Sequence, residues 1–247
     1  MLYAILSDVH ANPSALEKAL ADARGHGAEK IVCLGDVVGY GPDPTEAVAL
    51  CRSACDVTLM GNHDAAVAGL LRTDNFIAFA QDGVRRHAGA LAAADIAWLR
   101  ALPYQHCGKS FICVHGTLLH PERFSYMYDA DQICHAFGQM AQRRRRLLFV
   151  GHTHQAGAFV CTAENRVRMM ASGASLTMEP KEKYIVNVGS VGYPRADHDI
   201  TYVLYDTRAR TVVYRHLPFD FDGYLARLEA KGVIPPRWLL DYMGRAS

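Results

Sequence analysis

Five short apolar segments of this 247-residue chain each lead directly into a cluster of glycine, aspartate, asparagine or histidine. An apolar run of four or five residues bounded by polar and turn-forming residues is typical of a buried β-strand. The segments and their clusters are 2–6 with 7–10 (SDVH), 31–34 with 35–36 (GD), 57–60 with 61–64 (GNHD), 111–114 with 115–116 (HG), and 147–150 with 151–154 (GHTH). Ligands of α/β sheets bind outside the carboxyl ends of the strands, so we expect the five clusters to meet at one site.

The segments between the first three strands have the spacing of helices. Asn12 and Pro13 favour the start of a helix, apolar residues follow at helical intervals, and Gly25 ends the pattern. A second helix is expected over 44–55. This alternation of strands and helices favours a parallel sheet covered by helices on both faces.

Two later stretches depart from the alternation. From 64 to about 107 the helical spacing continues without a clear strand, and we interpret this stretch as a helical insertion over one edge of the fold. Beyond 158 the chain turns to short β segments, which predict a second sheet packed on the first. No linker or repeat divides the sequence, so we expect a single domain over 1–247.

Composition and charge exclude several classes of protein. The chain is 50% hydrophobic and 21% charged, which excludes a disordered polypeptide. With 26 basic and 25 acidic residues its net charge is +1, so we expect neither a nucleic-acid nor a membrane partner. The sequence has no transmembrane run and no signal-peptide pattern at its start, and its seven cysteines follow no pairing pattern. We therefore expect a cytoplasmic protein with reduced thiols.

The spacing of the polar residues points to metal binding. In an extended chain, residues two apart point the same way, so Asp8 and His10 can hold one ion together, and so can His152 and His154. Carboxylate, amide and imidazole ligands suit manganese, iron or zinc, and differ from the cysteine-rich ligands of structural zinc sites.

The number of candidate ligands favours two metals over one. Seven candidates end the predicted strands: Asp8, His10, Asp36, Asn62, His115, His152 and His154. A single catalytic metal uses about three protein ligands, whereas seven with a shared carboxylate fit two ions roughly 3.5–4 Å apart. Asp36 is the natural bridging ligand, and His63 then remains for acid–base chemistry.

Taken in this order, the motifs closely resemble those of the calcineurin-like metallophosphoesterases, from residue 1 to about 195. Residues 35–44 (GDVVGYGPDP) and 187–192 (NVGSVG) are also similar to segments of the bacterial members. The resemblance implies a mixed α/β (α+β) fold, a four-layer α-β-β-α sandwich of two facing mixed sheets with a dinuclear centre between them. It implies hydrolysis of phosphoesters by a hydroxide generated at two divalent metals. Manganese is the expected metal, with iron, zinc or nickel as alternatives.

The resemblance also implies a division of roles. The first metal would take Asp8, His10, Asp36 and His154, and the second Asp36, Asn62, His115 and His152. His63 would be the general acid or a donor to the phosphoryl oxygen. One departure is clear: the aspartate that pairs with the catalytic histidine in protein phosphatases is replaced by Gly39, so phosphoprotein hydrolysis is not implied.

The expected substrate is a small phosphodiester or a nucleotide, because the insertion should narrow the cleft. Hydrolysis of a dinucleoside polyphosphate is an alternative, for which Arg195 and Arg123 would supply cations. A non-catalytic scaffold of the same fold is a minor alternative, which the intact ligand set and His63 disfavour. Arg195 and His120 are the candidate substrate contacts, and the sequence carries no signal of an oligomeric state.

Overall fold

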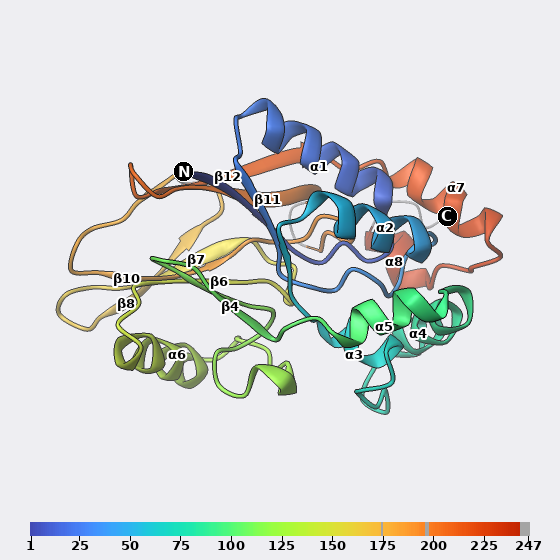
Figure 1. Cartoon of the computed structure of the whole chain (residues 1–247), viewed down its shortest axis with the longest axis horizontal. Coiled ribbons are helices and arrows are strands. Elements are labelled where there is room, and N and C mark those ends of the chain that lie inside the picture. The colour runs from blue at the N-terminus through green and yellow to red at the C-terminus, as the bar shows by residue number, and fades with distance from the viewer. Residues whose placement is uncertain (174, 196–197, 243–247) are drawn as a thin grey trace.

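The computed structural model describes residues 1–173, 175–195 and 198–242 and contains two six-stranded mixed sheets (Figure 1). The first sheet has the order β3-β2-β1-β11-β12-β9. Its strands are β1 (Leu2–Leu6), β2 (Lys30–Cys33), β3 (Val57–Thr58), β9 (Leu176–Thr177), β11 (Asp199–Asp206) and β12 (Thr211–Pro218). The second sheet has the order β4-β5-β6-β10-β7-β8. Its strands are β4 (Gln105–Cys107), β5 (Ile112–Val114), β6 (Leu147–Val150), β7 (Gly157–Cys161), β8 (Val167–Ala171) and β10 (Lys183–Asn187).

Helices cover the outer faces of both sheets and one end of the sandwich (Figure 1). They are α1 (Pro13–Gly25), α2 (Pro44–Ala54), α3 (Asn62–Val67), α4 (Ala78–Ala90), α5 (Ala93–Arg100), α6 (Ala130–Gln142), α7 (Phe221–Ala230) and α8 (Arg237–Tyr242), with a 3₁₀ turn at Pro121–Arg123. Of the described residues, no helix is long and apolar enough to cross a membrane.

Three hydrophobic cores separate the four layers. Along β1, Ala4 and Leu6 face the core shared with α1, α2 and α7, whereas Ile5 faces the core between the two sheets. This alternation follows from the two-residue period of a strand. A third core joins the second sheet to α6. The expected α-β-β-α sandwich of two mixed sheets is thereby confirmed.

Local signals located the first two helices and the five strands that precede the polar clusters. The helix expected after Asn12 is α1, and the Asn12 side chain accepts a hydrogen bond from the Ala15 amide at 3.3 Å. Asp129 caps α6 in the same way through the Gln132 amide at 2.8 Å. Each cap satisfies a main-chain N–H that has no partner inside its helix.

The division of strands between the sheets differs from the sequence-based expectation. Strands β5 and β6 belong to the second sheet, and the late strands β11 and β12 extend the first. β11 pairs antiparallel with the free edge of β1, with Ala4 opposite Leu204. In addition, 105–107 forms β4, so the insertion expected to be helical to about 107 ends in a strand of the second sheet.

We expect the core between the sheets to supply a large part of the stability. Phe149 on β6 is fully buried, and its ring centroid lies 5.6 Å from that of Tyr205 on β11. Phe149→Ala should lower the free energy of unfolding by about 3–5 kcal/mol, measured by urea denaturation. Met169→Ala on β8 is the control, since Met169 is 77% exposed and should cost less than about 0.5 kcal/mol. Equal losses in the two variants would contradict this role of the core.

Candidate metal centre and substrate cavity

The polar clusters at the strand ends meet in one buried space between the sheets. Those after β1, β2 and β3 come from the first sheet, and those after β5 and β6 come from the second. The structure brings all seven expected ligands together there: Asp8, His10, Asp36, Asn62, His115, His152 and His154. Strand ends of both sheets therefore form the site, which agrees with the location between two facing sheets that the family resemblance implies.

One group of ligands comprises Asp8, His10 and His154. The Nε2 atoms of His10 and His154 lie 3.1 Å apart, and Asp8 Oδ1 lies 3.2 Å from the Nε2 of His154. The Nδ1 atom of His10 donates to the Val38 carbonyl, and that of His154 donates to the Tyr193 carbonyl. A neutral imidazole carries a hydrogen on only one of its two nitrogens, which here is Nδ1. Both Nε2 atoms therefore present lone pairs to each other and to a carboxylate.

The second group has the same character. The Nε2 atom of His115 lies 3.2 Å from Asn62 Oδ1, 3.2 Å from His152 Nδ1 and 3.3 Å from Asp36 Oδ2. His115 Nδ1 donates to the Leu34 carbonyl at 3.1 Å. Electron-pair donors again surround a common point.

The two aspartates each use one oxygen for the main chain and turn the other toward the ligands. Asp36 Oδ1 accepts from the His63 amide at 2.9 Å, and Asp8 Oδ2 accepts from the His152 amide at 3.0 Å. Asp36 Oδ2 lies 3.6 Å from His10 Nε2, as well as near His115. Asp36 therefore stands between the two groups, while Asp8 Oδ1 has no hydrogen-bond donor.

The electrostatics of the centre favour a positive charge. Burial opposes protonation of His115, but the carboxylates of Asp36 and Asp8 outweigh it and raise the pKa to about 9. Burial likewise tends to raise the pKa of both aspartates, but the neighbouring histidines hold the pKa of each below its usual value. Without a metal, the raised pKa of His115 leaves a proton on its Nε2 atom, among two ionised carboxylates. A divalent cation would take the place of that positive charge, since metal ligands must be deprotonated.

The main chain at these strand ends is left-handed at five of the seven ligand positions, namely Asp8, His10, Asp36, His152 and His154. Such φ angles are uncommon outside glycine and occur often at functional sites. Gly61 allows the main chain after β3 to lie against Asp36, because a Cβ atom at this position would overlap the Asp36 side chain. The loops are thus folded tightly so that their side chains point inward.

His63 lies at the edge of the centre and lines the adjoining cavity. Its Nδ1 atom is buried against Gly39 without a hydrogen-bond partner, and a Cβ atom at Gly39 would overlap the ring. Burial lowers the pKa of His63 to about 4, although the Asp36 charge acts in the opposite direction. Asp64 does not hydrogen-bond to His63: it accepts from the amides of Val38 and Gly61 and ties their loops together.

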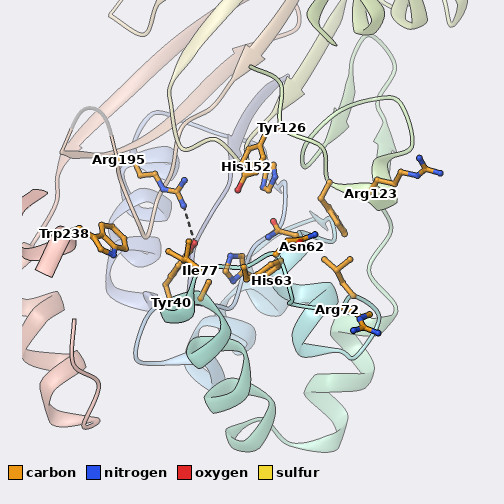
Figure 2. Close-up of a pocket in the computed structure, with 15 residues that line it drawn as sticks. Tyr40, Asn62, His63, Arg72, Ile77, Arg123, Tyr126, His152, Arg195 and Trp238 are labelled. Carbon is orange, nitrogen blue, oxygen red and sulfur yellow. Dashed lines mark hydrogen bonds between the residues drawn. The ribbon is translucent and has the colours of Figure 1, made fainter. Parts of the chain in front are cut away.

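A cavity of about 630 Å³ opens beside Asn62, His63 and His152 (Figure 2). The segment 71–80 of the insertion forms one wall, residues 123–126 form another, and Arg195 and Trp238 complete it. The structure thus places the insertion at the cavity, in line with the expectation that it narrows the cleft.

The two candidate substrate contacts have different positions. Arg195 lines the cavity, and its guanidinium donates to the Tyr40 hydroxyl at 3.4 Å (Figure 2). His120 is exposed, lies 3.3 Å from the Glu122 carboxylate and is not among the residues that line this cavity. In this structure the ring of His120 faces Glu122, outside the residues that line this cavity, whereas Arg195 lines it.

Several aromatic residues of the cavity were not expected from the sequence. Tyr126 stacks on His152, with ring centroids 3.9 Å apart and planes at 14°, and Phe76 lies 5.0 Å from His63. Trp238 reaches the same cavity from α8. None of them belongs to a motif, so only tertiary contact identifies them.

A family model for the calcineurin-like phosphoesterase superfamily domain matches residues 1–210. The chain belongs to the calcineurin-like phosphoesterase superfamily. It is 31% identical to a metallophosphoesterase from Sphaerobacter thermophilus, with a TM-score of 0.83 over 100% of this chain and 99% of that one. An uncharacterized protein of Methanocaldococcus jannaschii is 29% identical over 251 residues, 99% of this chain and 98% of the relative. A hypothetical protein from Pyrococcus horikoshii OT3 shares the fold at 17% identity, with a TM-score of 0.73 over 97% and 96% of the two chains.

Membership confirms the resemblance drawn from the motifs. Calcineurin-like phosphoesterases are phosphoester hydrolases that use divalent metals, and the clustered aspartates and histidines of this chain could bind such metals. The insertion of this phosphoesterase borders the cavity that adjoins two of those residues, Asn62 and His152.

We expect Asp36→Asn to weaken metal binding at both positions, because the carboxylate oxygen that it removes lies near His10 and His115. Titration of metal-depleted protein with Mn²⁺ should give two ions per wild-type chain, and both affinities should fall at least tenfold, roughly, in the variant. Asp22→Asn is the control, since Asp22 forms an ion pair with Arg215 away from the centre. Loss of only one ion would contradict the bridging position of Asp36.

Proposed function

We propose that this phosphoesterase uses two divalent cations to hydrolyse a small phosphodiester or a nucleotide. The main support is the ligand geometry: two groups of electron-pair donors share Asp36, and an open cavity adjoins Asn62 and His152. A single structural metal would need neither a carboxylate shared between two ligand groups nor a cavity that lets a substrate reach it.

The residues of the two groups define where the cations would bind. Asp8, His10, Asp36 and His154 would hold the first, and Asp36, Asn62, His115 and His152 the second. When bound, the cations would acidify a water molecule and offset the charge of the phosphoryl oxygens. We propose manganese, with iron, zinc or nickel as alternatives, because the ligands are oxygen and imidazole nitrogen.

The chain's own side chains would orient the substrate. His63 presents its ring to the cavity next to Asn62, within reach of a phosphoryl or leaving oxygen. Arg195 carries a positive charge at the same cavity and would bind a phosphate oxygen. The rings of Phe76 and Tyr126 offer apolar surface to the group that the phosphate carries.

The size of the cavity supports a small substrate. A volume of about 630 Å³ lies within the range of small-molecule sites, and the insertion restricts access from one side. A folded phosphoprotein would need an open groove. The near-neutral net charge gives no support for a nucleic-acid substrate.

A dinucleoside polyphosphate is the second candidate, and the placement of two arginine side chains favours it. Arg195 and Arg123 both line the cavity, on opposite sides of Asn62 and His152 (Figure 2). The Arg123 guanidinium points away from Asn62 and His152 (Figure 2), so it would have to turn inward to contact a chain of phosphates that also reaches Arg195. The scaffold alternative has less support, because a non-catalytic protein would not need the complete ligand set or His63 at the cavity.

A reducing compartment is supported by the cysteines. All seven are free thiols, and four of them are buried in the cores. We therefore propose a cytoplasmic location, since exported proteins of this size commonly form disulfides.

The proposed function can be tested by a substrate screen. Mn²⁺-loaded protein should hydrolyse bis-(p-nitrophenyl) phosphate or a nucleotide, and a chelator should abolish the activity until Mn²⁺ is restored. Diadenosine tetraphosphate is assayed in parallel with Arg123→Ala, which should impair only this longer substrate. Absence of metal-dependent hydrolysis of every ester tested would contradict the proposal.

His63→Ala should retain both metals but lower kcat on a substrate with a poor leaving group by about 10²–10⁴. With a nitrophenyl leaving group the loss should be smaller, because that oxygen needs little protonation. His26→Ala, an exposed histidine at the end of α1, is the matched control. Loss of metal would make His63 a ligand, and equal losses for both leaving groups would make it an electrostatic donor.

A further inference from the structure

Helix α4 of the insertion holds the loop of residues 39–41, which follows Asp36. The Gly39 amide donates to His87 Nδ1 at 2.9 Å, and His87 Nε2 donates to the Gly41 carbonyl at 2.9 Å. The Arg86 guanidinium donates to the Tyr40 carbonyl at 3.1 Å. Each of three consecutive loop residues thus has a main-chain group bonded to α4, and this 39–41 loop has no strand to fix it.

The protonation state of His87 follows from its partners. A main-chain N–H can only donate, so Nδ1 is the acceptor and Nε2 carries the hydrogen. His87 is 1% exposed, and burial lowers its pKa to about 3, so the ring is neutral. Both ring nitrogens are satisfied by the 39–41 loop, which indicates that holding this loop is what the side chain does.

The contact between α4 and the loop is close. A Cβ atom at Gly83, one turn before His87, would come within 2.8 Å of the Tyr40 amide nitrogen. Gly39 and Tyr40 have φ angles of 93° and 55°, a conformation that surrounding contacts must maintain.

The 39–41 loop forms the surface on which the His63 ring rests. The ring packs on Gly39, where a side chain would overlap it, and its centroid lies 4.6 Å from that of Tyr40. Phe76 of the insertion covers it from another side at 5.0 Å. Among the described residues no hydrogen bond reaches the Nδ1 atom of His63, so on that side the ring is oriented by packing.

We propose that His87 is a positioning residue for His63: by holding the 39–41 loop, it fixes the packing surface that orients the imidazole at the cavity. The 39–41 loop thus orients the His63 ring by packing, whereas in the protein phosphatases an aspartate pairs with the catalytic histidine. The consequence for catalysis rests on the proposed function, whereas the placement of the loop and ring does not. Three variants separate the two bonds: His87→Asn keeps an acceptor near Gly39, His87→Gln keeps a donor near Gly41, and His87→Ala keeps neither.

The first test uses metal-free protein and NMR. Exchange of the Gly39 amide hydrogen should accelerate at least tenfold, roughly, in His87→Ala and His87→Gln but not in His87→Asn. The ring signals of His63 should shift in His87→Ala. Val84→Ala is the matched control, because it removes a buried side chain from the same helix that makes no hydrogen bond to the loop. Unchanged Gly39 exchange and His63 signals in His87→Ala would overturn the proposal.

The second test uses Mn²⁺-loaded protein and a substrate with a poor leaving group. His87→Ala should lower kcat about 10–100-fold with KM within about twofold, because a small misplacement of a reacting group has effects of this size. His87→Asn should restore part of kcat. In the His63→Ala background the substitution should have no further effect, since His87 acts through His63.

The outcomes separate the two proposals. Equal losses from His87→Ala with and without His63 would overturn the positioning role, as would equal losses in Val84→Ala. If the wild type hydrolyses no ester, the proposed function is wrong, and the NMR measurements alone then decide whether His87 positions the 39–41 loop and His63. Should His87→Ala not fold, the asparagine and glutamine variants give the same comparison.

Discussion

His10, His115 and His154 each donate a ring hydrogen from Nδ1 to a main-chain carbonyl, and this interaction turns the Nε2 atom of each ring into the centre. The acceptors are carbonyls of loops and strand ends, so the orientation of each ring is set by the main-chain fold. With Asp8 and Asp36 held by main-chain amides, five of the ligands are directed before any cation binds. Such preorganisation reduces the reorganisation needed on metal binding.

The sandwich makes these interactions possible because it brings two sets of strand ends to one place. Phe149 and Tyr205 pack in the core between the two sheets and so help to keep the sheets face to face. The ligand loops then enter left-handed conformations that the surrounding packing must support. Stability of the core and geometry of the centre are therefore coupled.

The insertion has two roles that lie on different parts of its chain. Its segment 71–80 borders the cavity and limits what can enter. The following turns of α4 hold the 39–41 loop through Arg86 and His87. Because one helix contributes to both, a change in the cavity wall and a change in the support of His63 are not independent, and substitutions in α4 should be interpreted with both in mind.

The sequence by itself determined the features that depend on neighbouring residues. Helix α1 follows from Asn12, Pro13 and helical spacing, and the strands before the metal ligands follow from short apolar runs. Together with their order, these motifs identified the family and predicted the seven candidate ligands, which the structure brings together. Tertiary structure decided what depends on distant residues: the pairing of β1 with β11, the outward position of His120 and the contact of His87 with Gly39. The physical reason is that a helix cap acts over three residues, whereas these contacts join segments with no shared local pattern, brought together only when the two sheets and the insertion pack.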